Sequence, residues 1–155
     1  MRPLLVANYS INLKYVAHTV MLLYMRDTQR KGDIANAKAI STFTAYGYDV
    51  SIPLTESALY DLVVDDGLKM YRVQAKYCSS KNQQVGLRRI HSNSKGYVVK
   101  RYLKDSYDWL YIYNSDGTEY LIKECLEGRN SIKPTHKDLL IHNIQLLVNN
   151  ESNID

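Results

Sequence analysis

Three polar side chains on two neighbouring apolar runs are placed where they could converge on one point. Asp61 lies in the first run, and Gln74 and Lys76 follow thirteen and fifteen residues later. The intervening residues 65–67, Asp-Asp-Gly, are a strong hairpin signal, so we predict two antiparallel strands. Gln74 and Lys76, two residues apart, then share a strand face. Such a convergence is what a metal-dependent site for phosphodiester cleavage requires.

Two of these residues also have a simpler interpretation. Asp61 could cap the turn at a strand end, and Lys76 could be a solvated residue on an exposed strand face. A charged residue inside an apolar run must be paired, solvated or bound to a metal. Both interpretations therefore stay open at the level of the sequence.

The elements that must position these residues follow from hydrophobic spacing. Residues 33–46 predict a helix with Ile34, Ala37, Ile40 and Phe43 as its apolar stripe, ended by Gly47. We predict strands over residues 48–54 (interrupted by Pro53), 59–64, 70–77, 97–103, 109–113 and 119–122. The polar span 78–96 is expected to be a loop with room for a short helical piece, and residues 134–148 a final helix. This order predicts an α/β fold, a mixed central sheet flanked by helices.

The N-terminal region reads as a separate extension. Residues 11–25 favour an amphipathic helix, although a strand stays possible, and residues 26–32 favour a charged connector. We predict a helical extension over 1–30, one domain over 31–148 and a flexible tail over 149–155. The apolar stretch is shorter than a bilayer span and lacks a signal-peptide cleavage site, so we expect no membrane contact. Two cysteines give no disulfide framework, which favours the cytoplasm.

The charges are unevenly distributed along the chain. Residues 67–104 contain no Asp or Glu but hold ten of the twenty Lys and Arg residues. A solvated surface is the simpler explanation, but uncompensated bases repel each other and favour a polyanion such as double-stranded DNA. A basic ribbon over 88–104, with its tip near 92–96, could enter the major groove. The predicted nucleic-acid contacts are Lys81, Arg88, Arg89, His91, Asn93, Lys95, Lys100, Arg101 and Lys104.

Residues 31–77 resemble the PD-(D/E)xK nuclease superfamily. The resemblance rests on the segment KGDIANAKAI, a glycine after the helix, and the strand segments YDLVV and VQAK, and YDWLYIYN stands where the superfamily has a late apolar strand. Gln in place of the usual second acid is similar to the small homing endonucleases encoded by bacterial group I introns. Archaeal Holliday junction resolvases share the same helix-glycine-strand opening.

The resemblance implies a role for each matching residue. Asp61 would be the principal ligand of Mg²⁺ or Mn²⁺, Gln74 would supply an amide oxygen, and the carbonyl of Val73 or Ala75 would complete the site. Lys76 would orient or help deprotonate the attacking water and stabilise the transition state. Relatives often carry a Glu on the first helix where this chain has Asn36, and Asp33, on the same helical face, could substitute for it.

These implications lead to a function hypothesis with two alternatives. The first hypothesis is a site-specific, divalent-metal-dependent double-strand DNA endonuclease of homing type. Cutting both strands requires two active sites, so a homo-oligomer, dimer or tetramer, is expected. The alternatives are a catalytically weak or inert DNA-binding module on the same fold, and a Holliday junction resolvase or restriction-type nuclease.

Overall fold

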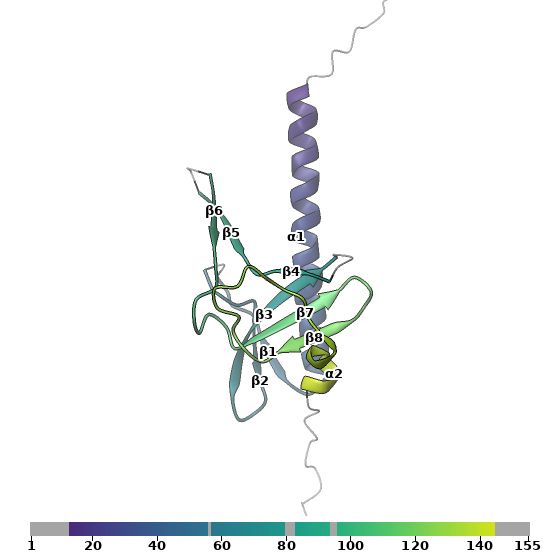
Figure 1. Cartoon of the computed structure of the whole chain (residues 1–155), viewed down its shortest axis with the longest axis vertical. Helices are drawn as coiled ribbons and strands as arrows, with labels where there is room; N and C mark the ends of the chain where they lie inside the picture. The colour runs from purple at the N-terminus through teal and green to yellow at the C-terminus, as the bar shows by residue number, and fades with distance from the viewer. Residues whose placement is uncertain (1–12, 56, 80–82, 94–95, 145–155) are drawn as a thin grey trace, which may run out of the picture. The chain divides into compact units, whose positions relative to one another are not determined.

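The computed structural model describes residues 13–55, 57–79, 83–93 and 96–144 (Figure 1). Two compact units divide the chain, Met1–Lys31 and Gly32–Asp155, and each is described here by itself. In chain order the elements are α1 (Leu13–Ala45), β1 (Asp49–Ser51), β2 (Leu62–Asp65), β3 (Met70–Cys78), β4 (Val85–Gly86), β5 (Arg89–Asn93), β6 (Gly96–Lys100), β7 (Trp109–Asn114), β8 (Glu119–Ile122), β9 (Ser131–Ile132), the 3₁₀ helix η1 (His136–Asp138) and α2 (Leu140–Asn143). None of the helices described is long and apolar enough to cross a membrane.

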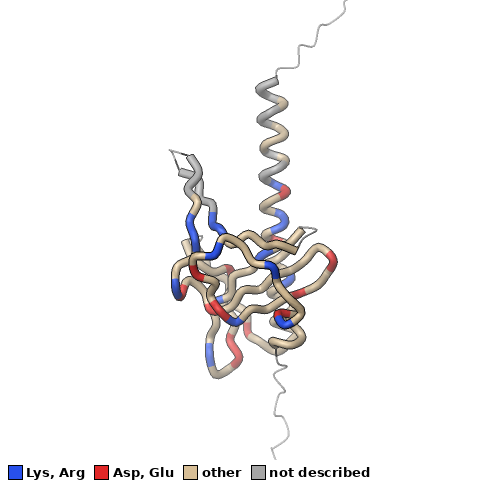
Figure 2. Tube along the Cα trace, viewed as in Figure 1, with Lys and Arg blue, Asp and Glu red and all other residues tan. Residues whose placement is uncertain are grey.

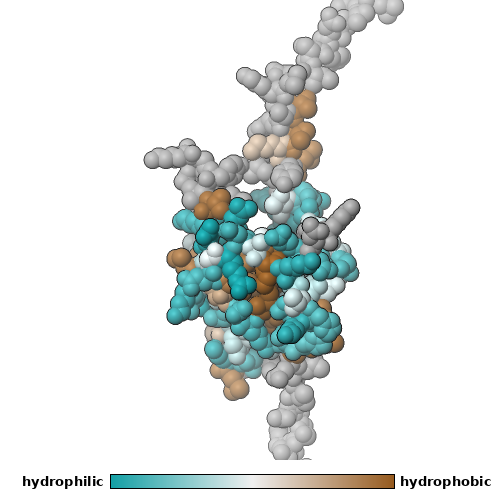
Figure 3. All heavy atoms as spheres, viewed as in Figure 1, coloured by the Kyte–Doolittle hydropathy of each residue, from teal (hydrophilic) through white to brown (hydrophobic). Residues whose placement is uncertain are grey.

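The charged connector predicted over residues 26–32 is wrong, because α1 is helical through this segment. The segment contains no proline, and Arg, Gln and Lys are good helix formers. Lys31 and Asp27 add an ion pair one turn apart, with 2.6 Å between Nζ and Oδ2. In the Met1–Lys31 unit, α1 exposes apolar side chains including Val16, Val20 and Leu23 (Figure 3).

The predicted end of the helix at Gly47 is confirmed. Gly47 has φ 87°, a conformation that side chains other than glycine's seldom adopt. The Tyr48 N–H reaches back 3.0 Å to the Phe43 carbonyl, which is the long-range bond of a Schellman motif. This reversal turns the chain directly from α1 into β1.

A five-stranded sheet in the order β1-β2-β3-β7-β8 forms the centre of the Gly32–Asp155 unit. The β3 and β7 strands run parallel, and the other neighbouring pairs run antiparallel. The predicted mixed sheet and the predicted β2–β3 hairpin are therefore confirmed. Because side chains alternate along a strand, β7 buries Trp109 and Tyr111 on one face and Leu110 and Ile112 on the other.

The residues 32–45 of α1 cover the first of these faces. Ala35, Ala39 and Phe43, each four residues after the last, are fully buried against the sheet. The predicted stripe is therefore right for Phe43, which is buried, and for Ile40, which packs against the core, and wrong for Ile34 and Ala37, which are exposed. Two alanines let the helix approach the sheet closely, and Phe43 stacks on Trp109 with ring centroids 6.1 Å apart.

The second sheet face is covered by loops and short strands. Residues 78–96 contain β4 and part of the β5–β6 ribbon, so no short helix occurs in the described part of this span. The ribbon pairs Arg89 with Lys100 and Asn93 with Gly96, in the antiparallel arrangement expected for residues 88–104. Figure 1 shows it as a two-stranded extension of the domain.

The final helix predicted over residues 134–148 is wrong at its start. Thr135 and Asp138 form a capping box that opens only the three-residue η1. Leu139 then takes an extended conformation and makes a β-bridge with Tyr120, which separates η1 from α2. Ile144 is extended again, with φ −112° and ψ 140°. Residues 145–155, including the predicted tail, lie outside the described residues.

Candidate active site

Asp61 lies at the point where β3 extends past the start of β2. Its N–H donates to the Val73 carbonyl at 2.9 Å, which continues the β2–β3 ladder by one residue. Its Oδ2 accepts the Ala75 N–H at 2.8 Å and also the Gln74 side-chain amide. The predicted hairpin therefore brings Asp61 and Gln74 into direct contact, with the nitrogen of Gln74 facing the carboxylate.

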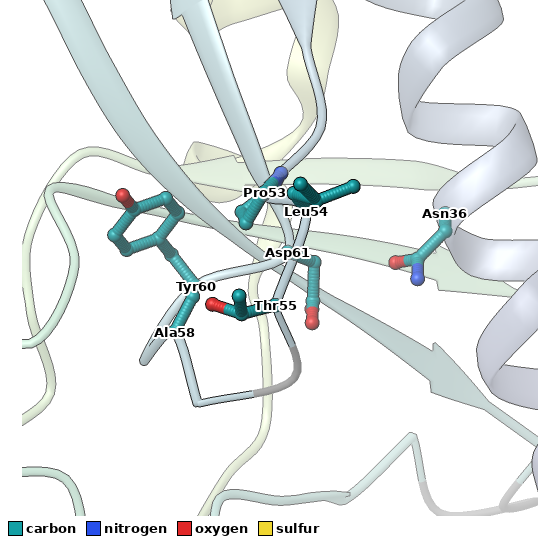
Figure 4. Close-up of a pocket in the computed structure, with 7 residues that line it drawn as sticks. All are labelled: Asn36, Pro53, Leu54, Thr55, Ala58, Tyr60 and Asp61. Atoms are coloured by element: carbon teal, nitrogen blue, oxygen red, sulfur yellow. The ribbon is translucent and has the colours of Figure 1, made fainter.

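Asp61 also lines an open pocket of about 240 Å³ at the sheet edge. Its other lining residues are Asn36 of α1 and, from the loop before β2, Pro53, Leu54, Thr55, Ala58 and Tyr60 (Figure 4). Figure 4 shows the side chains of Asn36 and Asp61 pointing into the same opening from α1 and from this loop. Asp33 is exposed on α1 and is not part of the pocket lining. The structure therefore places Asn36, and not Asp33, beside Asp61.

Burial perturbs the ionisation of both charged groups at this site. Burial raises the pKa of Asp61 above its usual value, although the Ala75 N–H and the positive charges of Lys76 and Arg89 oppose the rise. Burial lowers the pKa of Lys76, and the attraction of Asp61 only partly offsets this effect. Perturbed acids and bases that share a cleft are characteristic of reaction centres.

A second group of side chains, Lys76, Arg89 and Tyr102, lies near Asp61 at the base of the β5–β6 ribbon. The Lys76 Nζ lies 5.6 Å from the centre of the Tyr102 ring, and the Arg89 guanidinium carbon lies 6.0 Å from it. Arg89 also donates from Nη2 to the carbonyl of Ala58, a pocket residue, at 3.3 Å. Tyr102 is 2% exposed and was not predicted as a site residue, because nothing in the local sequence indicates that it is near Lys76.

The predicted nucleic-acid contacts fall into several groups. Arg88, Lys100, Arg101 and Lys104 are exposed around the ribbon, where Figure 2 shows Lys and Arg on both strands near the domain. Arg89 is half-buried and faces the site instead. His91 and Asn93 pair with Val98 and Gly96 in the ribbon register. Lys81 and Lys95 lie outside the described residues.

One base of the acid-free stretch is compensated by an acid outside it. The Arg72 guanidinium donates to both carboxylate oxygens of Asp108, at 3.0 and 3.1 Å. The Asp108 carboxylate also accepts the Arg72 backbone N–H at 2.8 Å. The expectation that all ten bases are uncompensated is therefore wrong, because the fold supplies partners that are distant in sequence.

Comparison with known proteins agrees with this geometry. The family model described as PD-(D/E)XK endonuclease matches residues 26–126. The chain belongs to this family. Among solved structures, the bacterial homing endonuclease I-Ssp6803I is similar, with a TM-score of 0.60 and 29% sequence identity, over 72% of this chain and 80% of that chain. No curated protein matches the chain.

PD-(D/E)XK nucleases generally use divalent metal ions, and the donor groups at and beside Asp61 fit one such ion. Asp61 supplies a carboxylate, Asn36 and Gln74 supply amide groups, and all can present the hard oxygen atoms that Mg²⁺ prefers. Gln74 would need a half-turn of its amide to present oxygen instead of nitrogen. Across the described residues, no group of three or more His, Cys, Asp or Glu side chains is placed to hold a metal.

Proposed function

We propose that this PD-(D/E)XK nuclease is a homing endonuclease of the kind encoded by bacterial group I introns. It would hydrolyse phosphodiester bonds in both strands of duplex DNA at a specific site, using Mg²⁺ or Mn²⁺, in the cytoplasm. The observation that carries the proposal is the half-buried Asp61 carboxylate at the pocket, in contact with Gln74 and within the electrostatic reach of Lys76.

In this proposal, metal binding and proton transfer belong to different residues. Asp61, Gln74 and Asn36 would hold the metal ion, which when bound supplies Lewis-acid stabilisation of the phosphate and activation of water. Lys76 has a lowered pKa, so a larger fraction of it is neutral near physiological pH than of an exposed lysine. It is suited to accept a proton from the attacking water. The backbone of Ala75 fixes the carboxylate orientation through its N–H.

The β5–β6 ribbon supports duplex DNA as the substrate. Lys100, the last residue of β6, pairs with Arg89, and Arg101 follows it directly in the chain. Both Lys100 and Arg101 are exposed. Contacts from such residues to phosphates position a protein on DNA, whereas base-edge contacts give specificity. A two-stranded β-ribbon is narrow enough for the major groove. Each chain carries one Asp61, so cleavage of both strands implies a homo-oligomer, dimer or tetramer.

One observation favours a second function, an inert DNA-binding module on the same fold. Asp61 is the only carboxylate among the described residues that line the pocket, and the neighbouring positions carry the amides of Asn36 and Gln74. With one negative charge, metal affinity depends on the DNA phosphate to complete the coordination. The two functions differ in whether bound DNA is cut.

A library experiment tests the proposal. Plasmids with random 30-base-pair inserts are incubated with the protein and Mg²⁺, and the linear products are sequenced. Homing-type cleavage predicts one enriched insert sequence and linear duplex products that are absent when EDTA is added. Binding without cleavage would favour the inert module, and preferential cleavage of four-way junctions would favour a resolvase.

A further inference from the structure

Two side chains at the base of the β5–β6 ribbon, Arg89 and Tyr102, lie near the pocket that Asp61 lines. Arg89 is the first residue of β5 and pairs with Lys100, the last residue of β6. Tyr102 follows two residues after Lys100 and is buried in the cluster that covers the second sheet face. The ribbon that is proposed to bind DNA is thus continuous in the chain with Arg89 and Tyr102, which lie near Lys76.

We infer that Arg89 is a catalytic residue that binds the scissile phosphate beside Lys76, and that Tyr102 is a positioning residue for both cations. This inference rests on the proposed nuclease function and extends it. No resemblance in sequence points to either residue, and both are brought to the site by the tertiary fold alone.

The contacts of Arg89 hold its guanidinium at the edge of the pocket. The bond from Nη2 to the Ala58 carbonyl uses one of the five N–H donors of the group. Ala58 lines the same opening as Asp61. A guanidinium presents paired donors in a planar fork that matches two phosphate oxygens, so its geometry suits a phosphate at this edge.

Tyr102 holds the two cations near each other despite their repulsion. Lys76 and Arg89 both approach its ring, at 5.6 and 6.0 Å from the centre, where the negative π-face attracts positive charge. Tyr102 is itself fixed by an edge-to-face contact with Tyr107, whose ring centre lies 5.0 Å away. The ring therefore forms a rigid support for both side chains.

Arg89 can supply permanent positive charge at this edge of the pocket. An arginine stays protonated at all physiological pH values. Its guanidinium therefore offers a phosphate a positive charge that does not change with pH.

Single-turnover cleavage of the selected duplex, with enzyme in saturating excess, tests the inference. Arg89→Gln should lower the maximal rate by about 100-fold to 1,000-fold, as loss of a transition-state donor does. Arg89→Lys keeps the charge and should restore part of the rate.

Three comparison variants show whether the effect is specific to the site. Lys137→Gln removes an exposed charge from η1 and should leave both DNA affinity and the rate at saturation unchanged. Tyr102→Phe keeps the ring and should retain most of the rate, whereas Tyr102→Leu should lower the rate at saturation. Circular dichroism confirms that each variant is folded before it is compared.

The inference is overturned if Arg89→Gln leaves the saturated rate unchanged, or changes the rate only through DNA affinity.

The two proposals fail in distinguishable ways. If wild type and Asp61→Asn give equal product, the nuclease function fails, and with it a catalytic role for Arg89. If wild type cleaves and Asp61→Asn does not, but Arg89→Gln matches wild type at saturation, then only the assignment of Arg89 fails.

Discussion

At the scale of single residues, Asp61 serves both the fold and the reaction through different parts of one carboxylate. Oδ2 accepts the Ala75 N–H and the Gln74 amide. The carboxylate therefore provides a hydrogen-bond partner for β3 at the position where β3 extends past the start of β2. Within the described structure Oδ1 accepts no hydrogen bond, and the group lines the pocket. Keeping such a charge half-buried costs stability that a neutral side chain would not cost.

The first prediction follows from this cost. Burial raises the folded-state pKa of Asp61 above its reference value of 3.8, so the ionised carboxylate destabilises the folded state. The penalty is absent below the unfolded-state pKa and develops as pH rises through the folded-state pKa. Asp61→Asn retains an oxygen for the Ala75 N–H and removes the charge, so it should raise the melting temperature at neutral pH.

Thermal melts of both proteins across the acid range measure this difference. The two melting temperatures should converge as the pH falls to about 3, where wild-type Asp61 is protonated in both states. A variant that melts below wild type at neutral pH would show that the carboxylate contributes net stability to the fold.

The sequence predicted part of the site and missed another part for a physical reason. Asp61 and Gln74 flank a short hairpin, so their spacing alone predicts that they meet. Arg89 and Tyr102 reach Lys76 through packing between segments far apart in the chain, and no local pattern encodes that approach. The roles assigned to all of these residues stay predictions until they are measured.

At the scale of elements, the turn from α1 into β1 determines how the helix covers the sheet. Gly47 allows the reversal, and Phe43 in the preceding turn is buried among Tyr48, Trp109 and Tyr111. Asn36 lies seven residues earlier on the same helix. The orientation of α1 therefore also decides whether Asn36 reaches the pocket.

Two Gly→Ala substitutions in this region should have opposite effects on stability. Gly47→Ala forces alanine into the left-handed region and should cost about 1–2 kcal/mol. Gly32→Ala lies inside α1 where an added Cβ meets nothing within 4 Å, and it should stabilise by about 0.5–1 kcal/mol. Urea denaturation measures both, and a stabilising Gly47→Ala would contradict the assigned helix end.

The β5–β6 ribbon carries a prediction about salt. Lys100→Gln combined with Arg101→Gln should weaken binding to the selected duplex and reduce the slope of log K against log salt by about two. Lys137→Gln removes an exposed charge from η1 and serves as the control. Fluorescence anisotropy at several salt concentrations gives the slopes, and equal slopes for the double variant and wild type would remove both bases from the interface.

Other elements show where local patterns mislead. The apolar spacing of α1 correctly includes Ile40 and Phe43, but it also favours Ile34, whereas the sheet accepts the smaller Ala35 and Ala39. The apolar spacing of residues 134–148 predicts a helix, but the β-bridge between Leu139 and Tyr120 interrupts it. In both cases a tertiary contact outweighs local propensity.

At the scale of the whole molecule, one Asp61 per chain raises the question of how both DNA strands are cut. Two copies would place two Asp61 sites on one duplex, and a symmetric assembly would do so on opposite strands. We predict a mass two or four times the 17.9 kDa of one chain. Light scattering coupled to size-exclusion chromatography measures this mass, with and without DNA, and a monomer in both states would leave single-strand nicking as the expected activity.

The central claim is that Asp61 anchors a metal-dependent nuclease site. Its most direct test is single-turnover cleavage of the selected duplex by wild type and Asp61→Asn, in Mg²⁺ and after EDTA. Wild type should cut both strands in Mg²⁺ only, and Asp61→Asn should bind DNA similarly but cut at least about 1,000-fold more slowly. Cleavage that persists in EDTA, or an Asp61→Asn rate equal to wild type, would contradict the claim.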